Sequence, residues 1–268
     1  MKRIIAAALA ATVMAACAPQ ARRLTIVHAN DTHSHLEPTR HGTEGVIERA
    51  AFIDSIRKAD GKRNVLLVHA GDFNQGSPYY TVLGGKLEVD LVNALGYDCI
   101  ELGNHEFDSG VEDLTGRAAN LRCRLVCANY DFSSIELGKY VKPYAVFKRG
   151  GYKVGIVGLL CDISKVVNKN VADGIRKVEG SDADIVNGWT SYLREQEGCD
   201  LVLALTHIGY AEDIELASKL HGVDAIIGGH SHTRIDEPAW VSDADGKKIP
   251  VVTDWCWGHT VGVLTVTD

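Results

Sequence analysis

The sequence predicts an α/β fold with a largely parallel central sheet and helices outside it. Short apolar runs alternate along the chain with segments in which apolar residues recur at helical spacing. The composition, with 46% hydrophobic and 24% charged residues, is that of an ordinary globular protein. A length of 268 residues suits one large α/β domain better than two domains.

Each predicted element follows from its pattern. The strands are the buried apolar runs at 24–29, 65–70, 99–102, 124–128, 154–159, 201–206 and 224–229. The helices are the amphipathic segments at about 46–58, 79–95, 110–121, 183–197 and 211–219. A turn at Arg149–Gly151 predicts a hairpin. The runs 248–254 and 260–268 predict closing strands, because the second alternates at period two.

The N-terminus has the pattern of a targeting segment. Two basic residues precede an apolar run at 4–16 that is too short to span a bilayer. The run ends in MAAC, which resembles a bacterial lipobox whose cysteine becomes the lipidated first residue. We therefore expect residues 1–16 to be a lipoprotein-type signal peptide, Cys17 to be lipidated, and the protein to reside in the cell envelope or periplasm. Met14 is less usual than Leu at its position, so ordinary secretion is the alternative.

Charge and cysteine content exclude some functions. The net charge of −7 becomes −7 − 2 = −9 when residues 1–16 are removed. No cluster of Lys and Arg is present, so we expect no nucleic acid partner, and membrane contact only through the N-terminal lipid. The cysteines after Cys17 match no zinc-finger spacing, and their disulfide pairing is not predicted. They are Cys99, Cys123, Cys127, Cys161, Cys199 and Cys256.

Five polar motifs follow predicted strands. They are NDTHSH, GDFNQGS, GNHEFD, THIG and GGHSH. The carboxyl ends of parallel strands open on a common crevice, so we expect these motifs to converge there. Gly71 before Asp72 and Gly103 before Asn104 fit the tight bends that such loops need.

The side chains in these motifs are typical of a metal site. The candidates are Asp31, His33, Asp72, Asn104, His105, Asp108, His207, His230 and His232. Nitrogen and oxygen ligands without cysteine favour Mn, Fe, Co, Zn or Ni. Two of these carboxylates and four of these imidazoles already exceed the number of ligands that one tetrahedral ion needs. Such a set suits two ions that share a carboxylate. Two divalent ions would keep the site positive within an acidic chain, so a phosphate ester is the expected substrate.

In their order and spacing, the five motifs resemble those of the calcineurin-like metallophosphoesterases. GNHEFD together with GDFNQGS is similar to the 5′-nucleotidase branch. The resemblance covers nearly all of the mature chain. It implies a four-layer α/β/β/α sandwich over residues 22–268, equivalent to the N-terminal catalytic domain of two-domain enzymes.

The resemblance also implies a role for each candidate. One metal ion would be held by Asp31, His33, Asp72 and His232, and the second by Asp72, Asn104, His207 and His230. His105 would face the phosphoryl group and assist the leaving alcohol, Asp108 would orient and charge His105, and Glu106 would be structural. Many 5′-nucleotidases carry Asn or Gln where this chain has His232, which leaves the metal preference open.

The expected function is two-metal hydrolysis of phosphate esters, with release of phosphate from nucleotides. The alternatives are a phosphodiesterase or nucleotide-sugar hydrolase, and a catalytic subunit that needs a separate nucleotide-binding chain. Two-domain relatives recognise the base in a second domain, and the printed sequence ends at Asp268. A non-catalytic metal-binding subunit is a further rival, against which the intact His105 and Asp108 argue. Trp255 and Trp257 are predicted to be packing residues, with a place in the substrate cleft as the alternative.

Overall fold

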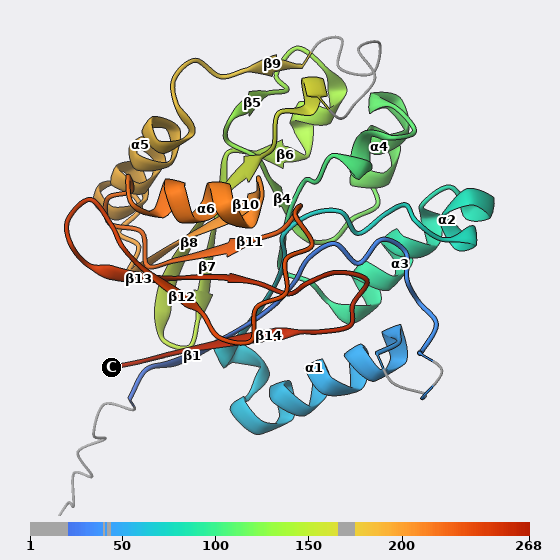
Figure 1. The fold of residues 1–268 in the computed structure, drawn as a ribbon, viewed down its shortest axis with the longest axis horizontal. Helices are drawn as coiled ribbons and strands as arrows, with labels where there is room; N and C mark the ends of the chain where they lie inside the picture. The colour runs from blue at the N-terminus through green and yellow to red at the C-terminus, as the bar shows by residue number, and fades with distance from the viewer. Residues whose placement is uncertain (1–20, 40, 42–43, 166–174) are drawn as a thin grey trace, which may run out of the picture.

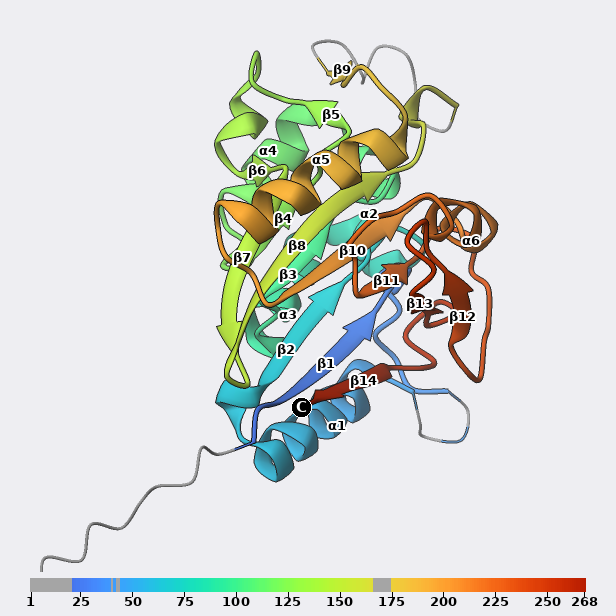
Figure 2. The same cartoon turned by 90° about the vertical axis from the view of Figure 1, so that its left-hand side faces the viewer.

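The computed structural model describes residues 21–39, 41, 44–165 and 175–268. Two six-stranded sheets pack face to face, and helices cover both outer faces, as Figure 1 and Figure 2 show. The predicted fold class and its four layers are confirmed. The predicted signal peptide and Cys17 lie outside the described residues. In the described part of the chain, no helix has the length and apolar character needed to cross a bilayer.

The first sheet carries the N-terminal motifs. Its order is β14-β1-β2-β3-β4-β6, with β14 antiparallel to β1 and the other pairs parallel. Its strands are β1 (Arg23–Ala29), β2 (Val65–His69), β3 (Cys99–Glu101), β4 (Arg124–Val126), β6 (Val141–Lys142) and β14 (Gly262–Thr267).

The second sheet carries the C-terminal motifs. Its order is β12-β13-β11-β10-β8-β7, with four parallel central strands and an antiparallel strand at each edge. Its strands are β7 (Tyr144–Arg149), β8 (Tyr152–Leu160), β10 (Leu201–His207), β11 (Ala225–Gly228), β12 (Ala239–Ser242) and β13 (Lys248–Thr253). The predicted hairpin is confirmed, because Arg149 pairs with Tyr152 across Gly150 and Gly151. A small sheet pairs β5 (Tyr130–Asp131) with β9 (Arg176–Lys177).

Helices from the two halves of the chain cover opposite faces (Figure 1). The first sheet is covered by α1 (Val46–Asp60), α3 (Lys86–Leu95) and α4 (Val111–Ala118), and the second by α5 (Asp182–Glu195) and α6 (Tyr210–Ala217). The prediction of one helix over 79–95 is wrong. Two helices, α2 (Pro78–Leu83) and α3, meet at Gly84 and Gly85, whose φ angles of 61° and 79° end the first helix in the left-handed region.

Alternation along the strands separates three hydrophobic cores. In β2, Leu66 and Val68 face the space between the sheets, while Val65 and Leu67 face the helices of the first sheet. In β10, Leu203 and Leu205 lie between the sheets, whereas Val202 and Ala204 contact the layer of α5 and α6. Because successive side chains point to opposite faces, a strand buried on both faces is apolar throughout, which explains the continuous runs in the sequence.

Candidate metal centre

The five polar motifs meet at the carboxyl ends of strands from both sheets. Three of them occupy the loops after β1, β2 and β3, whereas THIG begins in the last two residues of β10 and GGHSH in the last residue of β11. Backbone hydrogen bonds join the first two loops, from Asp31 N to Gly71 O at 3.0 Å and from His33 N to Asp72 O at 3.0 Å. The motifs therefore converge as predicted, and we call the common edge of the strands where they meet the crevice.

Three groups of potential ligand atoms overlap in this crevice. Asp31, His33 and His232 form one group, and Asp72, His207 and His230 form another, with all ligand atoms of a group within 4.8 Å of one another. A third group joins His33, Asp72 and His105.

His105 therefore lies close enough to the cluster to be a ligand by distance alone. Its placement outside the ligand set stays a prediction from the resemblance. Asn104 is buried, and its backbone leads directly into His105, whose N–H donates to Asp72 Oδ1 at 2.9 Å.

Several ligand atoms lack the partners that buried polar groups need. Asp31 Oδ1 and His207 Nε2 make no hydrogen bond of good angular geometry to any residue that the structure describes, although other ligand atoms lie near them. His207 Nε2 lies 3.0 Å from Asp72 Oδ2, and His33 Nε2 lies 3.0 Å from His232 Nε2. Inward-facing imidazole and carboxylate atoms without hydrogen bonds fit bound divalent ions, because a buried polar group otherwise costs stability.

The two buried carboxylates give the crevice a strong negative potential. Burial raises the pKa of Asp72, but the neighbouring His207 outweighs burial and holds the net pKa below its ordinary value. Burial lowers the pKa of His207, yet Asp72 and Asp31 raise it to about 10. A field that attracts a proton this strongly also attracts metal cations, which would displace that proton on binding.

Neighbouring groups orient the ligands from outside the cluster. His207 Nδ1 donates to Ala70 O at 2.6 Å, which leaves Nε2 facing the crevice. Asp31 Oδ2 accepts from Asn30 Nδ2 at 2.6 Å and from His230 N at 2.9 Å, which leaves Oδ1 facing the crevice. Asn30 therefore positions the Asp31 carboxylate. In the sequence, the only sign of this role is that Asn30 is the neighbour of Asp31.

Strained backbone is concentrated at the predicted ligands. Five of them have positive φ angles between 46° and 82°: Asp31, His33, Asp72, His230 and His232. Such conformations cost on the order of 1–3 kcal/mol each in residues other than glycine, and they gather at functional sites. Close packing adds to this constraint, because a Cβ on Gly103 would lie 2.1 Å from Asp72 Oδ1.

Glu106 holds two of the ligand-bearing loops together. Its Oε2 accepts the backbone N–H groups of Asp72 at 2.8 Å and Gly103 at 2.6 Å. Its Oε1 accepts those of Phe73 at 3.0 Å and Asn74 at 3.3 Å. The side chain is fully buried, and its contacts agree with the structural role predicted for it.

Replacing Glu106 with Gln should lower the free energy of unfolding by about 3 kcal/mol or more. Either orientation of the amide would turn an NH₂ group toward two backbone N–H donors. Urea unfolding measures the change, and the exposed Glu195→Gln serves as the control, with an expected effect within about 0.5 kcal/mol. Equal stability of the two variants would contradict this role for Glu106.

His105 and Asp108 form a pair at the edge of the cluster. His105 Nδ1 lies 2.8 Å from Asp108 Oδ2, and both side chains are about one-third exposed. The hydrogen bond to Asp108 raises the pKa of His105 and favours its protonated form. The ring centroids of His105 and His33 are 5.2 Å apart, so the pair borders the ligands.

Asp108→Asn should move the alkaline limb of the pH–rate profile to lower pH. The carboxylate raises the pKa of His105, so its loss lets the imidazole give up its proton at lower pH. Activity that depends on protonated His105 then falls earlier as pH rises. The measurement is kcat/KM against pH, and Asp245→Asn in the surface pair with His221 is the control. An unmoved limb would show that Asp108 does not charge His105.

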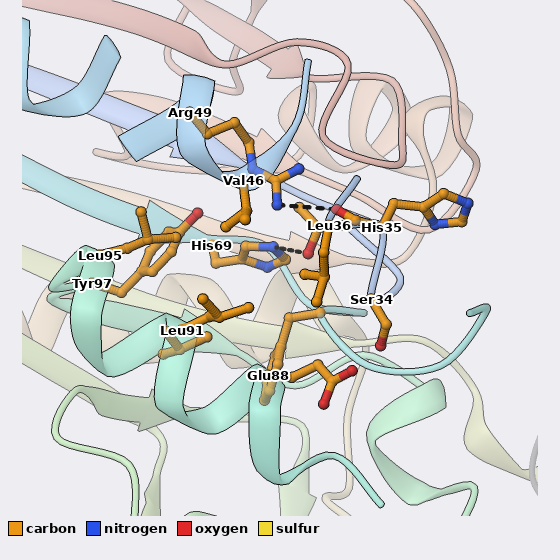
Figure 3. Close-up of a pocket in the computed structure, with 13 residues that line it drawn as sticks. Ser34, His35, Leu36, Val46, Arg49, His69, Glu88, Leu91, Leu95 and Tyr97 are labelled. Atoms are coloured by element: carbon orange, nitrogen blue, oxygen red, sulfur yellow. Dashed lines mark hydrogen bonds between the residues drawn. The ribbon is translucent and has the colours of Figure 1, made fainter. Parts of the chain in front are cut away.

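A partly open cavity lies behind the loop that carries Asp31 and His33 (Figure 3). Arg49 reaches from α1 to the carbonyl of His35 at 3.3 Å and to that of Trp257 at 3.5 Å. His69 lies inside this cavity, and burial lowers its pKa to about 3, so it is neutral. The cavity is separate from the ligand cluster, and Arg49 supports the loops from behind.

The remaining predictions concern residues around the crevice. His28 Nδ1 lies 2.5 Å from Asp254 Oδ2, and His28 belongs to none of the ligand groups. All six cysteines among the described residues are free thiols. Trp257 packs against the ring of His35 and remains 41% exposed.

Comparison with known proteins assigns the chain to a family. Residues 24–234 match the family of calcineurin-like phosphoesterases. A snake venom 5′-nucleotidase from Naja atra is 31% identical over 91% of this chain and 50% of the relative, and the 5′-nucleotidase from Bos taurus is 31% identical over 92% and 47%.

Solved structures of related proteins have the same fold as this chain. The 5′-nucleotidase precursor from Thermus thermophilus superimposes with a TM-score of 0.82 at 35% identity, covering 91% of this chain and 51% of that one. The Haemophilus influenzae NAD nucleotidase gives a TM-score of 0.79 at 29% identity, covering 92% and 48%. The chain spans about half the length of these relatives. It belongs to the calcineurin-like phosphoesterase family and is related to the 5′-nucleotidases.

Proposed function

We propose that this chain releases phosphate from nucleotides as a 5′-nucleotidase-like, two-metal phosphomonoesterase. The observation that carries the proposal is the group of buried aspartate and histidine ligand atoms that converge within 4.8 Å of one another, bordered by the hydrogen-bonded pair of His105 and Asp108. The names of related proteins, 5′-nucleotidase and NAD nucleotidase, support a nucleotide as the substrate.

The fit of the ligand groups supports two ions. Asp31, His33, Asp72 and His232 would hold one ion, and Asp72, Asn104, His207 and His230 the other. When bound, the ions would neutralise phosphoryl oxygens and activate a water molecule for in-line attack. Mn, Zn, Fe and Co all suit this set of nitrogen and oxygen donors.

The protein's own groups account for proton transfer and orientation. Protonated His105 would place its Nε2–H toward the phosphoryl group, because Asp108 already occupies Nδ1. This proton would stabilise the developing negative charge and pass to the leaving alcohol. Glu106 and Asn30 would keep the loops and Asp31 in place during the reaction.

The test is phosphate release by the purified chain after loading with Mn²⁺. The panel contains AMP, other nucleotides, a nucleotide sugar, and simple phosphate mono- and diesters. Preferred release of phosphate from nucleoside monophosphates supports the proposal. Preferred hydrolysis of diesters or nucleotide sugars would replace it with one of the alternative hydrolase functions. Turnover that appears only after addition of a nucleotide-binding partner chain would make this chain a catalytic subunit.

We also propose that the protein is exported and anchored through a lipid on Cys17. The support is the basic, apolar and small-residue pattern that precedes this cysteine. Mass spectrometry of the protein from a bacterial membrane fraction should find an acylated Cys17 as the first residue. An unmodified N-terminus in the soluble periplasmic fraction would favour ordinary secretion.

A further inference from the structure

A row of aromatic rings lies beside the metal-ligand cluster. The rings of His35 and Trp257 are stacked, with centroids 5.0 Å apart and planes inclined by 19°. His259 follows at 5.8 Å from Trp257, and Trp255 lies 4.9 Å from His259. The guanidinium of Arg234 lies 5.4 Å from the centre of the Trp255 ring. We call these five residues the aromatic arc.

The aromatic arc is linked to all three members of one ligand group, by hydrogen bonds to Asp31 and His33 and by the short chain segment after His232. The carbonyl of His33 lies 2.9 Å from His35 Nδ1, and the carbonyl of Asp31 accepts the backbone N–H of Trp257 at 2.6 Å. Arg234, at the other end, follows His232 by two residues. The arc therefore borders the ion site that Asp31, His33 and His232 would form.

The two tryptophans are held in conformations that bulky residues rarely adopt. The φ angles of Trp255 and Trp257 are 59° and 60°, in the left-handed region. Two anchors fix them, because Trp255 O accepts from Asn30 Nδ2 at 2.9 Å and Trp257 O lies 3.5 Å from Arg49 Nη1. Packing alone does not account for this strain, since the Trp257 side chain remains 41% exposed.

Part of the aromatic arc is exposed to solvent. His35, Trp255 and His259 are half-buried, whereas Trp257 and Arg234 are exposed. The Arg234 guanidinium lies over the Trp255 ring, and the His35 ring points away from the cavity behind the loop (Figure 3). An indole face stacks well on a planar heteroaromatic ring, and a guanidinium adds a cationic end.

We propose that the aromatic arc is a subsite for the nucleobase of the substrate, built into this domain, with Trp257 as its main stacking residue. The inference rests on the proposed function, because the ester would place its phosphoryl group in the ligand cluster and its base against the arc. Trp257 would then determine specificity without taking part in the chemistry.

The test compares AMP with ribose 5-phosphate, two phosphate monoesters at the 5-hydroxyl of a ribose ring, of which only AMP carries a base. The quantity is the ratio of their kcat/KM values with the Mn²⁺-loaded chain. Trp257→Gly removes the ring and adopts a positive φ without strain, so folding is preserved. This variant should lower the ratio on the order of 10-fold, through AMP alone, because loss of one base–aromatic stack has that effect. Trp257→Phe should restore most of the ratio, and Trp240→Ala, at an exposed tryptophan of β12, should leave it unchanged.

A second readout does not depend on catalysis. Adenosine, which carries no phosphate, should quench the tryptophan fluorescence of the wild-type chain and quench that of Trp257→Gly much less. A wild-type ratio near one, or an unchanged ratio and unchanged quenching in Trp257→Gly, would overturn the subsite. Absence of phosphate release from both esters, with quenching by adenosine intact, would overturn the proposed reaction and leave the subsite standing.

Discussion

Asp72→Ala should abolish binding of both metal ions and lower phosphate release by about 10³-fold or more. Asp72 belongs to two of the three ligand groups, one with His33 and His105 and one with His207 and His230. Its loss removes the carboxylate predicted to bridge the ions and leaves His207 without its nearest counter-charge. Metal content by inductively coupled plasma mass spectrometry and kcat/KM for AMP are the two measurements.

The control for Asp72→Ala is Asp90→Ala, at an exposed carboxylate of α3 that pairs with Lys86. This change should leave metal content intact and activity within about twofold, because it removes a surface charge that belongs to none of the ligand groups. Retention of two ions per chain in Asp72→Ala would contradict the assignment of Asp72 as the bridging ligand.

His105→Ala should keep both metal ions and lower kcat by about 10²- to 10⁴-fold, the usual contribution of a general acid. Asp108 already bonds Nδ1, and this hydrogen bond raises the pKa of His105, which favours an N–H donor at Nε2 beside the ligand groups. KM should change little if His105 acts mainly on the transition state. Single-turnover kinetics and metal analysis on the same preparation separate the two effects.

His221→Ala is a matched control, because His221 and Asp245 form an exposed pair with the same 2.8 Å contact outside the ligand groups. That variant should behave as wild type. Loss of metal from His105→Ala would instead make His105 a ligand, an arrangement that its distance to His33 and Asp72 permits.

The sequence by itself determined the fold class and the Asp, Asn and His residues that converge in the crevice. The spacing of apolar residues in strands and helices depends on the direction in which each side chain leaves the backbone, which is a local property. A continuous apolar run such as 65–69 therefore predicted a strand buried on both faces of its sheet. The candidate ligands could also be found from local sequence, because each motif is a short contiguous stretch at the end of a strand. The helix predicted over 79–95 failed for the same local reason, since the apolar pattern outweighed the stop signal of two consecutive glycines.

Only the tertiary structure decided how the motifs meet. His33 and His232 lie 3.0 Å apart across 199 residues and follow strands of different sheets, and no periodicity encodes such a contact. The same holds for the four N–H groups gathered by Glu106 and for the stacking of Trp257 on His35. Local pattern fixes what a segment can be, but the free energy that orders these loops comes from contacts between distant segments, which exist only once both sheets have packed.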